Sequence, residues 1–262
     1  MPGRISGKVY METRTLELWC AYPVDLLDDG VAEACADLLS EQEQARWQRF
    51  RYEANRRESL TSRALARISL SHMHPTNPPT QWDFTVNAYG KPQAVPECGV
   101  HFNLSNTPGL VVCLLAEGAQ VGVDAEPHSR AAQIAKLADD LFSPAEQAQL
   151  MTLHGEKKID RALSLWTLKE AYIKGRGLAL SLPLKYISFL FGGQAGVSLR
   201  LDPPIGDDPS RWQFGLLDYA GHRVALMVEQ TSSWKLRVLE ARPVLNPPII
   251  IHPGVLGWFP WA

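Results

Sequence analysis

The segment His72–Thr80 constrains the fold of this chain more than any other, because it contains Pro75, Pro78 and Pro79. Proline has no backbone N–H and its ring collides with the preceding helical turn, so no helix continues through this segment. A helical sequence pattern lies before it and strand patterns follow it. The sequence therefore predicts both helices and strands, in separate stretches of the chain.

A long helical stretch precedes these prolines. It begins at Ser40, which lies three residues before Glu43 in the spacing of a capping box. Leu60, Ala64 and Ile68 then recur every four residues, which places them on one buried helix face. We expect this helical stretch to continue until the prolines end it.

Arginines crowd the same stretch. They are Arg46, Arg49, Arg51, Arg56, Arg57, Arg63 and Arg67. On a helix, Arg56, Arg63 and Arg67 share one face, and planar guanidinium groups suit bidentate contacts with phosphate. The alternative interpretation is a solvated basic surface.

Short apolar or alternating runs elsewhere predict strands and turns. Strands are expected at Leu16–Tyr22, Trp82–Val86, His101–Ser105, Leu110–Ala116 and Val121–Glu126, with a turn at Tyr89–Pro92 and further strands between Tyr186 and Glu240.

Two more helices are expected. Phe142–Leu153 opens with Ser143 as N-cap, Pro144 in the first turn and Glu146 at the reciprocal capping position. Arg161–Gly175 has the pattern of a second helix, with an acid near its middle.

The composition is that of an ordinary globular protein, with 45% apolar and 21% charged residues in a chain of 262. A formal net charge of −2 argues against a nucleic-acid partner, although it leaves room for a local basic patch. The longest apolar run, Val111–Ala116, is far shorter than a membrane span of ~20 residues. The four cysteines lie far apart, so we expect reduced thiols and a cytoplasmic protein.

The run V-G-V-D-A-E at Val121–Glu126 carries two acids on one strand face. Side chains alternate along a strand, so Asp124 and Glu126 point the same way and repel each other unless a cation or proton compensates. Carboxylates completed by water and substrate phosphate are the ligands that Mg²⁺ prefers. The alternative is an exposed strand end with solvated acids.

The run L-W-T-L-K-E-A-Y-I-K-G-R-G at Leu165–Gly177 carries a third acid. On a helix, Trp166, Glu170 and Lys174 stack on one face, and Lys169 is the neighbour of Glu170. Apolar flanks indicate a partly buried helix, in which Glu170 could be a third metal ligand or a base. The alternative is a surface Glu–Lys pair.

Two short motifs offer further polar groups. In Y-G-K-P, Lys91 follows a turn glycine and is held by Pro92, so its charge is expected to be displayed on a stiff loop. In F-N-L-S-N-T, Ser105 and Asn106 offer hydrogen-bonding groups at a strand end. Each motif alone could also be ordinary surface.

Together and in this order, these motifs resemble the 4'-phosphopantetheinyl transferase superfamily, specifically the longer type that activates surfactin and enterobactin synthetases. That family combines a basic helix with G-K-P, F-N-x-S-[H], x-G-x-D-x-E, F-[ST]-x-x-E and W-x-x-K-E-A-x-x-K-x-x-G. This sequence supplies Gly90–Pro92, Phe102–Ser105, Gly122–Glu126, Phe142–Glu146 and Trp166–Gly177. The resemblance covers roughly residues 40–190.

The resemblance implies an enzyme that moves 4'-phosphopantetheine from coenzyme A to a serine of an apo acyl or peptidyl carrier protein. It implies that Asp124, Glu126 and Glu170 hold Mg²⁺ and that Asp124, Glu170 and Lys174 are catalytic. The residues that it implies for coenzyme A are Arg56, Arg57, Arg63, Lys91, Pro92, Ser105, Asn106, Lys169 and Lys174. The family commonly has histidine at the position of Asn106, and asparagine keeps a hydrogen-bond donor but cannot relay a proton.

The resemblance also implies two similar α+β halves related by a pseudo-twofold, with the active site between them and one chain sufficient as a monomer. The expected division is 1–117 for the half with the basic helix and the coenzyme A loops, 118–240 for the half with the metal site and carrier-docking segment, and 241–262 for a proline- and aromatic-rich tail. That tail cannot form a regular helix or a central strand, and its simplest interpretation is a strap on the surface.

The segment after Gly177 is the expected carrier-docking site, through Leu178, Leu180, Leu182 and Leu184, although these alternating leucines also fit a core strand. Two other functions remain as alternatives: a Mg²⁺-dependent phosphoesterase, and a non-catalytic module that binds carrier protein or coenzyme A. The sequence leaves the natural carrier open among fatty-acid, polyketide, siderophore and other peptide synthetases.

Overall fold

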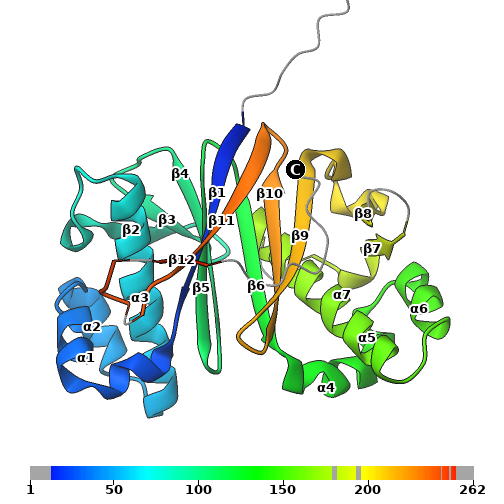
Figure 1. Cartoon of the computed structure of the whole chain (residues 1–262). Coiled ribbons are helices and arrows are strands. Elements are labelled where there is room, and N and C mark those ends of the chain that lie inside the picture. Colours follow the sequence, from blue (N-terminus) through cyan, green and yellow to red (C-terminus); the bar gives the residue numbers. More distant parts are fainter. Residues whose placement is uncertain (1–12, 179–181, 193–195, 243, 248, 252–262) are drawn as a thin grey trace, which may run out of the picture.

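The computed structural model describes residues 13–178, 182–192, 196–242, 244–247 and 249–251. Two sheets stand face to face at its centre, and helices cover the outer side of each (Figure 1). The fold is α+β, as the family resemblance implies.

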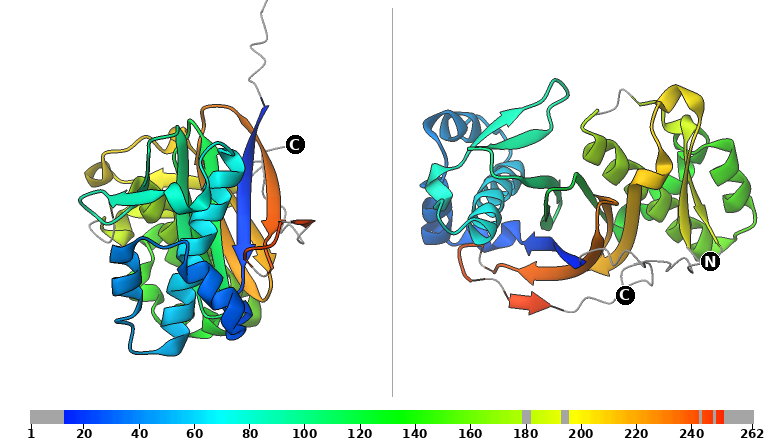
Figure 2. Two further views of the ribbon diagram at one scale, coloured as in Figure 1. Left: turned by 90° about the vertical axis from the view of Figure 1, so that its left-hand side faces the viewer. Right: turned by 90° about the horizontal axis from the view of Figure 1, so that it is seen from above.

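The first sheet has five strands in the order β12-β11-β1-β5-β4. The bounds are β1 Thr13–Ala21, β4 Val100–Thr107, β5 Leu110–Glu117, β11 Ser233–Glu240 and β12 Ile249–Ile251. All neighbours are antiparallel except β1 and β11, which run parallel and pair Thr13 with Ser233 through Cys20 with Glu240. Segments from both ends of the described chain thus lie side by side, as both views in Figure 2 show.

The second sheet has three antiparallel strands in the order β6-β10-β9. The bounds are β6 Val121–Pro127, β9 Trp212–Tyr219 and β10 His222–Glu229. Two hairpins stand apart from the sheets: β2 (Asp83–Val86) with β3 (Pro92–Val95), and β7 (Ile187–Phe191) with β8 (Val197–Leu201).

The helices fall into two groups, one for each sheet. They are α1 Asp29–Ala36, α2 Glu41–Trp47 and α3 Glu53–Met73 in the first group, and α4 Ala131–Lys136, α5 Ala138–Leu141, α6 Pro144–Met151 and α7 Gly155–Arg176 in the second. Short 3-10 turns occur at Pro23–Leu27, Pro79–Gln81, His128–Arg130, Leu184–Tyr186, Pro203–Ile205 and Pro209–Arg211. Both predicted capping boxes, at Ser40 and Ser143, are confirmed.

The single helical stretch expected after Ser40 is wrong, because the chain breaks between α2 and α3. Tyr52 adopts an extended backbone, with φ −103° and ψ 128°, and α3 begins one residue later. The indole of Trp47 donates to the carbonyl oxygen of Arg56 at 3.0 Å, which fixes the end of α2 against the start of α3. None of the residues in α2 is buried, so no apolar stripe holds it in line with α3.

Three apolar cores separate these layers. One lies between α3 and the first sheet, and another between α7 and the second sheet. The third lies between the sheets, where Leu18, Val112 and Leu114 share a core with Val123 and Leu226. The order helix, sheet, sheet, helix therefore brings β4 of one sheet next to β6 of the other.

The two sides of the molecule repeat one order of elements. β1, α3, the β2–β3 hairpin, β4 and β5 follow each other as do β6, α7, the β7–β8 hairpin, β9 and β10. In each set the last strand pairs antiparallel with both the first strand and the preceding strand. The twofold relation between the sets and the division at 117/118 stay predictions; β11, which that division gives to the second half, pairs with β1.

The cysteines in this structure are free thiols, three of them buried and Cys98 partly exposed, as expected. Among the helices in the described ranges, none combines the length and the apolar run that a bilayer crossing requires. The tail contributes β12 at the edge of the first sheet, and its residues 243, 248 and 252–262 lie outside the described part.

Helix α7 packs so closely against strand β6 that their backbones touch at Gly122 and Gly175. A Cβ added to Gly122 would meet the carbonyl oxygen of Ala171 and would lie 2.7 Å from the backbone nitrogen of Gly175. Both neighbours are backbone atoms, so the helix itself would have to move. Glycine at position 122 therefore sets the distance between strand and helix.

We predict that Gly122→Ala destabilises the protein by about 1–3 kcal/mol, the usual cost of overpacking, and more if α7 cannot shift. Gly30→Ala in α1 is the control, because its Cβ would meet only a side-chain oxygen of Asp28 at 3.3 Å and alanine favours a helix. Urea unfolding followed by circular dichroism measures both variants. Equal stability of the two variants would show that the contact at Gly122 does not limit the packing.

Candidate active site

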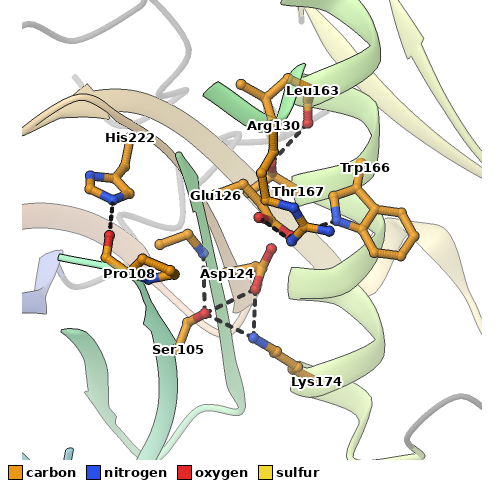
Figure 3. A network of polar contacts seen from close by, with 11 residues as sticks. Ser105, Pro108, Asp124, Glu126, Arg130, Leu163, Trp166, Thr167, Lys174 and His222 are labelled. Carbon is orange, nitrogen blue, oxygen red and sulfur yellow. Dashed lines mark hydrogen bonds and ion pairs between the residues drawn. The ribbon is translucent and has the colours of Figure 1, made fainter. Parts of the chain in front are cut away.

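The acids of the predicted site come from two elements that pack against each other. Asp124 and Glu126 lie on β6, and Glu170 and Lys174 lie on α7. Both acids of β6 are buried, with side-chain exposures of 6% and 8%, whereas Lys174 keeps 31% of its side chain exposed. Figure 3 shows Asp124 and Lys174 pointing toward each other between strand and helix.

Ser105 of β4 joins the two sheets at this point. Its hydroxyl donates to Oδ1 of Asp124 at 2.9 Å and accepts from the backbone N–H of Ala125 at 3.2 Å and from Nζ of Lys174 at 2.9 Å. Because a hydroxyl has one donor and two lone pairs, Ser105 has no position left for a ligand. In this structure the hydroxyl of Ser105 holds Asp124 and Lys174, and the implied contact between Ser105 and coenzyme A stays a prediction.

Asn103, two residues before Ser105 on β4, also accepts a hydrogen bond from the backbone of β6. The amide oxygen of Asn103 accepts from the backbone N–H of Val123 at 2.8 Å. Asn103 and Ser105 therefore replace the backbone hydrogen bonds that the free edge of β6 would otherwise lack. In F-N-L-S, both polar residues are used to hold the acidic strand in place.

Lys174 supplies a cation to the first acid. Its Nζ lies 2.5 Å from Oδ1 of Asp124 and forms a charge-assisted hydrogen bond with it. The other oxygen of Asp124, Oδ2, is buried without a hydrogen-bond partner. A buried carboxylate oxygen with no partner is costly, so this atom is a place where a ligand could bind favourably.

Glu170, like Asp124, has a carboxylate oxygen without a partner. Its Oε1 is buried and has no hydrogen-bond partner. Burial, and then the negative charge of Asp124, raise the pKa of Glu170 to about 7, although Lys174 opposes the shift. Glu170 is therefore poised to exchange a proton near neutral pH.

Glu126 is held by two donors instead. Nη1 of Arg130 lies 2.8 Å from Oε1 and 2.7 Å from Oε2, and the indole nitrogen of Trp166 donates to Oε1 at 2.8 Å (Figure 3). Sequence reasoning missed Arg130, because it lies beyond Pro127 in a turn where no periodicity places its side chain. It did place Trp166 on the face of Glu170, but it assigned the indole no role.

The unpartnered oxygens test whether these residues fit a divalent cation. Asp124 Oδ2 and Glu170 Oε1 are hard oxygen donors from opposite elements, and a cation would satisfy both. Within the described residues, however, no three side chains of His, Cys, Asp or Glu are gathered into a metal-binding group. The residues fit a cation through Asp124 and Glu170, while the oxygens of Glu126 are taken by Arg130 and Trp166.

Lys169 lies outside the site, and the implied contact with coenzyme A is wrong. Its side chain is fully buried and its Nζ lies 2.7 Å from Oε2 of Glu146. It also donates to the carbonyl oxygens of Leu184 and Ile187 at 2.7 and 2.6 Å. Next to Glu170 in sequence, Lys169 points about 100° away around the helix and toward the core.

Lys91 is not displayed on a loop as expected. Its Nζ donates to the carbonyl oxygens of Gly175 and Val121 at 2.7 and 3.2 Å and to the side chain of Gln120 at 3.1 Å. Burial lowers the pKa of Lys91 to about 8. Lys91 therefore fastens the hairpin loop to β6 and to the end of α7. Lys91, His101 and Arg176 are among the residues that line a neighbouring cavity of about 610 Å³.

A second cavity gathers residues from three predicted motifs. It has a volume of about 380 Å³, and its lining residues are Phe50, Asn55, Glu58, Ser59, Ser62, Arg63, Pro92, Leu104 and Asn106. Arg63, Pro92 and Asn106 were expected at coenzyme A, and the structure brings them to one place.

The other arginines of the basic segment are engaged elsewhere. Arg56 and Arg57 pair with Glu53 on the first turn of α3 and do not line that cavity. Arg67 is buried in an ion pair with Glu43, and the same acid lies 3.6 Å from Arg63. Of the arginine face expected from the sequence, Arg63 alone lines this cavity.

The segment expected to dock a carrier is only partly described, because Leu180 falls in 179–181. Leu182 and Leu184 are partly buried against the core of the second sheet. For these two leucines, the core interpretation fits the structure better than an exposed docking face.

We predict that Lys169→Met destabilises the protein by about 3–5 kcal/mol, because Glu146 would remain buried without its cation. Lys158→Met is the matched control, since Lys158 is exposed on the same helix. Urea unfolding measures the stability of both variants, and calorimetry measures their affinity for coenzyme A. An unchanged stability with weaker coenzyme A binding would restore the role that the sequence suggested.

We also predict that Glu170 titrates near pH 7 in metal-free protein. A raised folded-state pKa stabilises the fold below the unfolded value of about 4.5, and this contribution is lost as pH rises through 7. Carbon-13 NMR of the carboxyl groups, with Glu170→Gln for assignment, measures the midpoint. Asp124→Asn should lower it, because the carboxylate charge is removed; a midpoint below 5 in the wild type would contradict the prediction.

This chain is similar in sequence to known proteins, and part of it superposes on solved structures. A holo-(acyl-carrier-protein) synthase from Bacillus anthracis, solved in complex with CoA (3',5'-ADP), superposes with a TM-score of 0.36 at 16% identity, over 43% of this chain and 96% of that one. A 4'-phosphopantetheinyl transferase of Bacillus subtilis is 27% identical over 194 residues, which cover 74% of this chain and 84% of the relative.

The transferase HetI of Nostoc sp. is 32% identical over 165 residues, which cover 62% of this chain and 68% of the relative. The family model described as the 4'-phosphopantetheinyl transferase superfamily matches residues 120–227, which include both acids of β6 and all of α7. The chain belongs to the 4'-phosphopantetheinyl transferase superfamily.

Proposed function

We propose that this protein transfers 4'-phosphopantetheine from coenzyme A to a serine of an acyl or peptidyl carrier protein and releases 3',5'-ADP. One observation carries the proposal: Asp124 on β6 and Glu170 on α7 each have a buried carboxylate oxygen without a partner, and the partly exposed cation of Lys174 is paired with Asp124. In a chain of this superfamily, that arrangement suits a reaction in which negative charge must be held and a hydroxyl must lose its proton.

Asp124 and Glu170 would hold Mg²⁺, with Glu126 as a third candidate. When bound, the ion stabilises the negative charge of phosphate oxygens as a Lewis acid. The fit rests on the two unpartnered oxygens, which come from a strand and a helix that Gly122 keeps close together.

Lys174 would meet the diphosphate of coenzyme A. Its ammonium is anchored by Asp124 and Ser105, yet almost a third of the side chain faces solvent. A cation fixed in this way costs no further ordering when the charged substrate arrives. It would also stabilise the charge that builds up on the departing 3',5'-ADP.

Glu170 would take the proton of the carrier serine at its Oε1. The serine oxygen then forms a bond to the β-phosphorus of coenzyme A as the bond between this phosphorus and the 3',5'-ADP oxygen breaks. A pKa of about 7 leaves a large fraction of Glu170 deprotonated at neutral pH and still makes it an effective acceptor.

The cavity of about 380 Å³ is where we would place the 3'-phosphate end of coenzyme A. Arg63 supplies a partly exposed guanidinium there, and Asn106 supplies an amide donor in place of the histidine common in the family. Arg56, Arg57 and Lys91 remain candidates for coenzyme A binding, each held by other partners in this structure.

We further propose that the protein acts as a monomer, because one chain provides both β4 and β6 at the site. A cytoplasmic location agrees with its free thiols. Neither nucleic acid nor membrane is proposed as a partner.

The test is intact-mass spectrometry of purified apo fatty-acid and peptidyl carrier proteins after incubation with this protein, coenzyme A and Mg²⁺. We expect the mass of one phosphopantetheine to be added, and EDTA to prevent it. Glu170→Gln and Asp124→Asn should each lower the rate at least ~10²-fold, because each removes a charge at the reacting groups. Glu156→Gln, exposed on the first turn of α7, is the control and should retain the rate.

Three other outcomes would each point elsewhere. Loss of coenzyme A without modified carrier would favour a phosphoesterase. Binding of carrier or coenzyme A without any transfer would favour a non-catalytic module. Full transfer by Glu170→Gln would leave the reaction in place but move the proton acceptor to another group.

A further inference from the structure

Glu126 differs from the other two acids of the site in what surrounds its carboxylate. Oε1 accepts two hydrogen bonds, from Arg130 and Trp166, and Oε2 accepts one from Arg130. Asp124 and Glu170 each retain a buried oxygen with no partner. Glu126 is thus close enough to raise the pKa of Glu170, yet three of the roughly four acceptor sites of its carboxylate are already in use.

The side chain of Arg130 can move away from Glu126 easily. It lies at the end of a 3-10 turn, and 45% of its side chain is exposed, against 8% for Glu126. Among the described residues, Glu126 is the ion-pair partner that the structure shows for it. The guanidinium can therefore move into water without breaking another ion pair that the structure shows, whereas the side chain of Glu126 is buried.

Charge balance favours an exchange. In this structure Asp124, Glu126 and Glu170 face two cations, Lys174 and Arg130. With Lys174 in place, a divalent cation would balance the charge of all three acids once Glu170 has lost its proton, and Arg130 would then be a surplus positive charge beside it. Like charges in a buried site repel strongly, so cation and guanidinium should not share Glu126.

We propose that Arg130 is a built-in competitor of the metal: it occupies Glu126 in the metal-free protein and must release this acid before a divalent cation gains its third carboxylate. The inference rests on the proposed function, which supplies the cation. Trp166 stays bonded to Oε1 and keeps Glu126 oriented, so the exchange moves the arginine and not the acid. Arg130 is a positioning residue in this scheme, since it acts through Glu126.

The test measures Mn²⁺ binding to EDTA-treated protein without coenzyme A, by the electron paramagnetic resonance signal of the free ion. Arg130→Gln should bind Mn²⁺ on the order of fivefold more tightly than the wild type, because the competing ion pair is gone. Lys136→Gln removes the same charge from an exposed site at the end of α4, and should stay within about twofold. Adding Glu126→Gln to Arg130→Gln should abolish the gain, since Glu126 provides it.

Unchanged or weaker binding by Arg130→Gln would overturn the proposal, as would a gain that persists when Glu126 is also replaced. Absence of Mn²⁺ binding by both wild type and Arg130→Gln, with circular dichroism showing folded protein, would overturn it too. The carrier-modification assay on the same wild-type preparation separates the two proposals. Modified carrier with no gain in Arg130→Gln rejects the competition alone; the expected gain with unmodified carrier rejects the transferase.

Discussion

The site depends on the contact between the backbones of β6 and α7 at Gly122 and Gly175. Side chains at these positions would hold the helix away from the strand, because the atoms that a Cβ of Gly122 would meet are backbone atoms. With the two elements in contact, an acid of the strand and an acid of the helix share one small, poorly hydrated space. That sharing, and not any single residue, gives Glu170 a pKa near neutrality.

Burying several carboxylates close together is energetically unfavourable, and neighbouring donors offset part of this cost. Lys174 and Ser105 compensate one oxygen of Asp124, and Arg130 and Trp166 compensate both oxygens of Glu126. The apolar core between the two sheets and the core between α7 and the second sheet supply the stability that an incompletely compensated set of acids requires. The oxygens left without partners are then the places where a ligand gains the most.

Local periodicity explains which parts of this site could be predicted. Two residues separated by one position on a strand share a face, and residues four apart on a helix stack, so Asp124, Glu126, Glu170 and Lys174 were placed correctly relative to their own elements. Capping boxes at Ser40 and Ser143 likewise follow from local rules. That the strand and the helix meet came from the family resemblance, because no local pattern encodes a contact between segments about 45 residues apart.

The features that the sequence did not predict depend on contacts between residues far apart in the chain. The partner of Lys169 is Glu146 in α6, and nothing in the run of residues around Lys169 shows that its face turns toward that helix. The break after Trp47 depends on a hydrogen bond to Arg56, and the parallel pairing of β1 with β11 joins segments from opposite ends of the described chain. Arg130 lies in a turn, where side-chain direction follows no repeat.

Lys169 and Lys174 show why a motif alone does not assign roles. Both belong to one run of the sequence, both are lysines, and both neighbour Glu170 in space or along the chain. Lys174 is one helical turn from Glu170 and so faces the strand that carries Asp124, where its charge remains partly in water. Lys169 is one residue away and so faces the interior, where its charge survives only because Glu146 and two carbonyl oxygens surround it. The rotation of the helix, not the identity of the residue, determines which lysine can meet a substrate and which one fastens the helix to the core.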